Sequence, residues 1–140
     1  MNILRKIHPE LPLRAGLGLM YAYSGWDLMV NPTHWYGFVP RWFWQAVTRV
    51  VSIDNYLFLQ GAGELLMGLL FFAWFLPRSA VRLVAAAAAV EMALILLFVG
   101  IDPITFRDIG LLGGALALLI MITHRDFPKE TLGETIRPMK

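Results

Sequence analysis

Residues 102–123 read DPITFRDIGLLGGALALLIMIT, and this stretch decides the fold. It is long enough to cross a bilayer, which takes about 20 mostly apolar residues. Asp102 suits an N-cap and Pro103 suits the first helical position, so we expect the helix to begin there. Arg107 and Asp108 would then lie about one turn inside the helix. Charges at that depth are costly in lipid, so they should face other helices or a wet cavity.

Small residues follow this charged pair along the same helix. Gly110 and Gly114 have the four-residue spacing that lets a neighbouring helix approach closely. The sequence therefore predicts that this face of the helix, which also carries Arg107 and Asp108, packs against the rest of the protein.

The composition indicates one integral membrane domain. Of 140 residues, 58% are hydrophobic and only 16% are charged, which is too apolar for an ordinary soluble domain of this size. A net charge of +2 argues against nucleic acid as a partner. The absence of cysteine excludes disulfides, iron–sulfur clusters, thiolate metal sites and thiol–disulfide chemistry.

The apolar segments predict an all-α, four-helix membrane bundle. Residues 1–124 would form a single four-span domain and residues 125–140 a polar cytoplasmic tail. The four spans are expected at about 11–30, 56–76, 80–100 and 103–124.

The first span carries a stripe of small residues and one early charge. Gly18, Ala22 and Gly25 recur at helical spacing, which predicts a close contact with a second helix. We expect Arg14, near the start of the span, to reach the lipid headgroups with its long side chain.

The connection between the first two spans contains an amphipathic segment at about 40–53. Its polar residues fall on one helical face and its apolar residues on the other. The polar set is Arg41, Gln45, Thr48, Arg49 and Ser52, and the apolar set is Trp42, Phe43, Ala46, Val47, Val50 and Ile53. The pattern predicts an interfacial helix, either a plain surface anchor or a functional lid over the bundle.

The distribution of basic residues predicts the orientation. The N-terminal segment with Arg14, the turn after the second span and the tail hold three, two and four Lys or Arg, whereas the two opposite loops hold two and one. Nine against three places both termini in the cytoplasm. We therefore expect a multi-pass protein of the cell (inner) membrane.

Ionisable and polar residues then gather toward the outer side of all four spans. The candidates for ligand binding or proton transfer are Ser24, Asp27, Gln60, Glu64, Glu91, Arg107 and Asp108. Several acids beside one arginine cannot all be charged in a dry site, so we expect at least one, Glu91 foremost, to be protonated.

A structural role for the same residues stays open. Arg107 paired with Glu64 or Asp108 would hold the helices in register and bind nothing. His8, His34 and His124 are expected at the membrane surfaces, and no metal-ligand spacing, nucleotide-binding loop or catalytic triad is present.

Three motifs carry a resemblance to a known family. They are Arg14 leading to Ser24-Gly25, Glu64 followed by Gly68, and Arg107-Asp108 with the glycines after it. Over about residues 13–122 the chain resembles the DoxX family of small four-helix membrane proteins. That family is named after a subunit of a thiosulfate:quinone oxidoreductase, so the resemblance implies a four-helix fold and a quinone-linked role.

Two functional hypotheses follow. In the first, the protein is a membrane subunit of, or accessory to, a quinone-linked oxidoreductase, with Arg107 as hydrogen-bond donor to the quinone and Glu64 or Glu91 as proton carrier. In the second, it is a non-catalytic anchor whose buried charges only hold the helices together. Neither makes the chain an enzyme alone, since it encodes no redox centre, and both give it the bilayer and other membrane proteins as partners. A transporter is less favoured because no internal repeat is visible.

Overall fold

A computed structural model describes residues 8–126. Within that range the chain is all-helical, with five α-helices, one 3-10 helix and no strand. The elements in order are α1 (Glu10–Val30), η2 (Pro32–Phe38), α2 (Arg41–Val47), α3 (Ile53–Phe72), α4 (Arg78–Phe98) and α5 (Phe106–Asp126). The expected tail from residue 127 onward lies outside the described residues.

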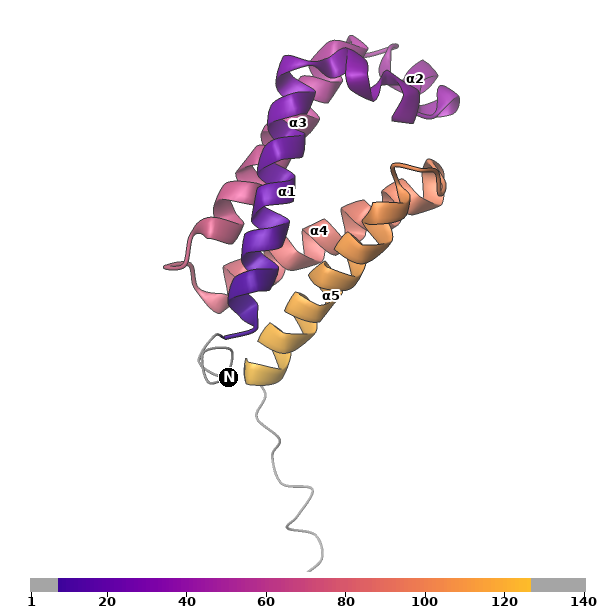
Figure 1. Cartoon of the computed structure of the whole chain (residues 1–140). Coiled ribbons are helices and arrows are strands. Elements are labelled where there is room, and N and C mark those ends of the chain that lie inside the picture. The colour runs from indigo at the N-terminus through magenta and orange to yellow at the C-terminus, as the bar shows by residue number, and fades with distance from the viewer. Residues whose placement is uncertain (1–7, 127–140) are drawn as a thin grey trace, which may run out of the picture.

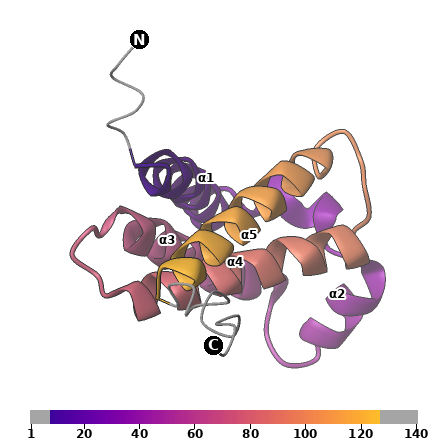
Figure 2. The ribbon, with the colours of Figure 1, turned by 90° about the horizontal axis from the view of Figure 1, so that it is seen from below.

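The four long helices form two pairs that diverge from a common end. Helix α1 lies along α3, and α4 lies along α5, whereas contacts between the pairs are sparse. Figure 1 shows the resulting V, which is closed near the start of α1 and open near α2; Figure 2 views it from the closed end.

The α1–α3 pair is held by backbone contact at glycines. A Cβ added to Gly25 would come within 2.5 Å of the Gly61 carbonyl oxygen, and one added to Gly68 would come within 2.7 Å of the Ala22 backbone nitrogen. Only glycine leaves room for such an approach. The predicted close-contact stripe on the first span is therefore confirmed.

Apolar side chains pack in two places. The main core fills the closed end of the V, where Tyr21, Phe71 and Leu118 from three helices are fully buried. A smaller cluster forms around Leu28 and Leu57 beneath the segment that joins α1 to α3. The inner faces of the two arms between these clusters are left unfilled.

Three helices are long and apolar enough to cross a membrane: α3, α4 and the Phe106–His124 part of α5. Many of their large apolar side chains are exposed. A lipid environment accounts for that exposure, because such side chains are costly in water. The chain is thus a helical protein with at least three segments suited to a bilayer.

Helix α5 begins at Phe106, so the expectation that it begins at Asp102 is wrong. Asp102 does act as a cap, but for a preceding turn: its Oδ1 accepts the backbone N–H groups of Ile104 and Thr105, each at 2.7 Å. These bonds hold the pKa of the Asp102 carboxyl below its usual value. Arg107 and Asp108 consequently stand in the first turn of α5.

The glycine face of α5 is not a close packing face in the described structure. No atom lies within 4 Å of a Cβ added to Gly110, and only the Leu13 side chain, at 3.9 Å, lies near one added to Gly114. Helix α5 instead packs through larger residues, among them Ala115, Leu118 and Ile122. The spacing alone therefore predicted the wrong contact face.

The predicted amphipathic helix at 40–53 is only half formed. Helix α2 ends at Val47, and Ile53 already belongs to α3. Trp44 and Val47 turn inward onto the small cluster around Leu28, so part of the segment packs as a cover over the α1–α3 arm. The Ser52 hydroxyl accepts the backbone N–H of Asn55 and caps α3.

Candidate functional site

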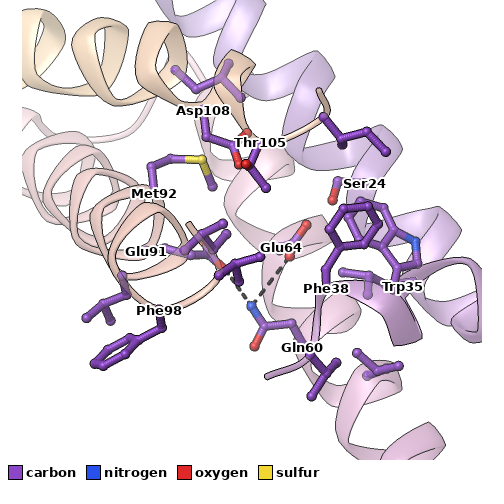
Figure 3. Close-up of a pocket in the computed structure, with 18 of the residues that line it drawn as sticks. Ser24, Trp35, Phe38, Gln60, Glu64, Glu91, Met92, Phe98, Thr105 and Asp108 are labelled. Atoms are coloured by element: carbon purple, nitrogen blue, oxygen red, sulfur yellow. Dashed lines mark hydrogen bonds between the residues drawn. The ribbon is translucent and has the colours of Figure 1, made fainter. Parts of the chain in front are cut away.

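A cavity of about 1180 Å³ occupies the space between the two arms. It is lined from α1, η2, α2, α3, α4 and α5, and its walls are mostly apolar. All seven residues proposed from the sequence lie on its lining: Ser24, Asp27, Gln60, Glu64, Glu91, Arg107 and Asp108. Figure 3 shows several of them converging from different helices. The fold thus brings the candidates together, while their roles stay a prediction.

Gln60, Glu64 and Glu91 form a hydrogen-bonded group on the inner wall, which we call the polar trio. The Gln60 amide nitrogen donates to Glu91 Oε1 at 2.6 Å and to Glu64 Oε1 at 3.5 Å. Its Oε1 accepts the Tyr56 hydroxyl at 3.0 Å. One neutral amide therefore joins carboxyl groups on α3 and α4, the helices that face each other across the gap between the arms (Figure 3).

The two acids differ in exposure. Glu64 is buried, with 6% of its surface exposed, and Ser24 of α1 faces it, whereas Glu91 is half-buried. The Tyr21 hydroxyl donates to the Ala88 carbonyl at 3.3 Å and lies beside the Glu91 carboxyl. Polar neighbours from α1, α3 and α4 thus surround two acids in an otherwise apolar wall, a placement typical of functional groups within a membrane.

Aromatic side chains surround the wide end of the cavity. Trp35 and Phe38 of η2 and Trp42 of α2 contribute to the lining from one side, and Phe98 from the end of α4 faces them. Trp42 and Phe98 are in contact, with ring centroids 5.4 Å apart. Since α2 reaches α4 through this contact, the segment between α1 and α3 partly spans the open end of the V.

Arg107 does not form the ion pair with Glu64 or Asp108 that the sequence analysis left open as a structural role. Its side chain is exposed, and its Nε donates to the Ile104 carbonyl at 3.0 Å. Among residues 8–126, no carboxylate oxygen lies within ion-pair distance of its guanidinium. Arg107 and half-buried Asp108 both belong to the cavity lining.

Asp27 has a structural task at the end of α1. Its carboxylate accepts hydrogen bonds from Asn31 at 2.8 Å and from the Trp35 indole at 2.9 Å, and it lies 3.3 Å from His34 Nδ1. These contacts fix η2 against α1. At the other end of the same segment the Tyr36 hydroxyl bonds to the Asp54 carboxylate, which raises the pKa of Tyr36.

Arg14 is the buried arginine among the side chains that the structure describes, and the sequence analysis did not predict its burial. Only 5% of its surface is exposed, and it donates to the backbone carbonyls of Phe71 at 2.9 Å and Ala73 at 2.8 Å. It also pairs with Glu10 at 3.2 Å. The expectation that Arg14 extends to the headgroups is therefore wrong, because the carbonyls at the end of α3 bind it.

The sequence analysis also did not name Tyr56, whose hydroxyl donates to Gln60. Its position four residues before Gln60 could have indicated this contact, because residues four apart lie on one face of a helix.

The residues that suggested the DoxX family occupy distinct places in this geometry. Ser24, Glu64, Arg107 and Asp108 line the cavity, whereas Arg14 and Gly25 join α1 to α3. The DoxX likeness itself stays a prediction. Comparison of the chain with protein-family models, curated proteins and solved structures finds no match.

Proposed function

We propose that this protein is a quinone-binding membrane subunit of, or accessory to, a quinone-linked oxidoreductase. The observation that carries the proposal is the cavity of about 1180 Å³, in which apolar and aromatic walls surround the polar trio and Arg107. A quinone combines an apolar body with two carbonyl oxygens, so it needs this mixture of surfaces. The DoxX resemblance points to the same class of ligand.

The residues divide the work as follows. Arg107 donates a hydrogen bond to a quinone carbonyl, since its terminal nitrogens are held by no carboxylate among the described residues. Glu64 or Glu91 carries the proton that accompanies quinone reduction, and Gln60 connects the two. The electrons come from another subunit, because the chain encodes no redox centre.

In the membrane arrangement that goes with this function, α1 is a fourth span beside the three apolar helices. It has 21 residues, as α4 does, and it is in backbone contact with α3. Both termini then lie in the cytoplasm, and the wide end of the cavity lies at the outer side of the inner membrane. The η2–α2 segment is an interfacial cover at that side.

Quinone affinity of the purified protein in lipid nanodiscs tests the proposal. A short-chain quinone should quench tryptophan fluorescence saturably, because Trp35 and Trp42 line the cavity. Arg107→Ala should weaken binding about tenfold, the effect of losing one hydrogen bond from a charged donor. Arg49→Ala is the matched control, since Arg49 is exposed and outside the cavity lining. Absence of saturable binding by the wild-type protein would refute the function.

A non-catalytic anchor is the second candidate, and one observation favours it. The polar trio already bonds α3 to α4, which is a link between the two arms that needs no ligand. In that case Glu91→Leu should lower the thermal unfolding temperature and change no quinone affinity. The quinone site instead predicts weaker binding by Glu91→Leu in protein that is still folded.

A further inference from the structure

A second, smaller hollow lies against the polar trio. Its volume is about 520 Å³, and only α3 and α4 line it. The lining residues are Tyr56, Leu59, Gln60, Gly63, Glu64, Met67 and Glu91. Five of them, the trio with Tyr56 and Met67, also line the main cavity. The trio is therefore part of the wall that the two hollows share.

The smaller hollow follows from loose packing between the arms. Contacts between α3 and α4 are few compared with those inside either pair. Gly63 lies at this gap, and no atom lies within 4 Å of a Cβ added to it. The contrast with Gly61 is direct, because a Cβ there would meet the Gly25 carbonyl oxygen at 2.6 Å. Gly63 thus serves no helix contact and leaves the way to the trio open.

The surroundings of this hollow indicate which phase it faces. Helices α3 and α4 both have the length and apolarity to cross a membrane. Leu59, one turn before Gly63, is 65% exposed beside the hollow. The wide end of the main cavity differs from this hollow, because aromatic side chains of η2 and α2 partly cover it. The smaller hollow therefore gives the trio a second approach, sideways between two helices that are suited to a bilayer.

We propose that a ligand reaches the polar trio laterally from the bilayer, through the gap between α3 and α4 at Gly63. The ligand is therefore a lipid-soluble molecule with a small polar headgroup and an apolar tail, and the tail lies in the gap while the headgroup meets Gln60 and the two acids. This inference rests on the proposed function in taking the cavity as a ligand site, and it adds the route and the phase from which the ligand comes.

Association kinetics of two quinones test the route. Gly63→Leu places a side chain in the open space over the smaller hollow. Gly16→Leu is the matched control, because a Cβ added to Gly16 also meets nothing within 4 Å and Gly16 lines neither hollow. In nanodiscs, Gly63→Leu should slow the association of a prenylated quinone roughly tenfold or more, within the range that substitutions at one site produce. Association of a tailless, water-soluble quinone should be unchanged. Equal rates for the two variants with the prenylated quinone would overturn the lateral route.

A second measurement tests the route without any quinone. The chain has no cysteine, so Gly63→Cys creates a single attachment point for a spin label. The label should collide with oxygen dissolved in the bilayer and be protected from a water-soluble nickel reagent. Strong collision with the nickel reagent would overturn the inference. If the wild-type protein binds neither quinone but the label is in lipid, the proposed function fails while the lateral opening stands.

Discussion

At the scale of single residues, Arg14 is a buried charge that links α1 to the end of α3. Its guanidinium donates to two carbonyls at the end of α3, where a helix leaves backbone acceptors without partners. Arg107 has the same side chain but is exposed, and it bonds only locally to Ile104. Two arginines of similar appearance in the sequence thus differ in what they stabilise.

Arg14→Ala should lower the free energy of unfolding by about 3 kcal/mol, because it leaves the buried carbonyl of Phe71 and the half-buried carbonyl of Ala73 without their donors. The matched variant Arg107→Ala should change it by less than about 0.5 kcal/mol, as expected for an exposed side chain. Unfolding of both proteins in the same detergent measures the difference. Equal losses would show that Arg14 is not a buried link between α1 and α3.

At the scale of helices, the pairing of α1 with α3 depends on the absence of side chains. Gly25 and Gly61 bring the two backbones together, and Gly18 and Gly68 continue the contact along the pair. Without a hydrophobic driving force between helices in lipid, such close packing supplies much of the attraction. The α1–α3 arm is therefore sensitive to the smallest enlargement.

Gly25→Ala should destabilise the protein by about 1–3 kcal/mol, because the new methyl group would lie 2.5 Å from the Gly61 carbonyl oxygen and the helices must move apart. Gly16→Ala, on the same helix but in open space, should be neutral or gain up to about 1 kcal/mol through helix propensity. Thermal unfolding of the two variants gives the comparison. A neutral Gly25→Ala would contradict the backbone contact.

The sequence could predict where the long helices lie and which residues line the cavity. It was less informative about which residues contact one another. Hydropathy and capping locate segments within a few residues, and the glycine stripe of α1 identified a true interface. The same reasoning failed for Gly110 and Gly114, since spacing indicates where a helix can be approached and not whether a partner is there. It failed for Arg14 because the carbonyls that bind it lie 57 and 59 residues away.

At the scale of the whole molecule, the unfilled space between the arms is the main feature. Candidate residues from four helices line one cavity, because successive long helices run in opposite directions and bring their polar positions to the same part of the molecule. The sequence could predict that convergence, whereas the divergence of the arms could not be foreseen. It depends on where large side chains such as Tyr21 and Phe71 fill the closed end.

The proposed topology predicts which side of the membrane each connection occupies. His8→Cys and Ser79→Cys should react with a membrane-impermeant maleimide only after the cells are opened, whereas Thr33→Cys should react in intact cells. The cysteine-free chain makes each variant its own single-site probe. Reaction of both His8→Cys and Thr33→Cys in intact cells would mean that α1 does not cross the membrane.

The V shape also bears on the lipids around the protein. A molecule that is narrow at one end and broad at the other takes up unequal areas of the two leaflets. In the proposed topology the closed end faces the cytoplasm, so the protein would displace more lipid from the outer leaflet than from the inner one. We therefore expect it to act as a wedge and to favour a bilayer that curves toward the cytoplasm.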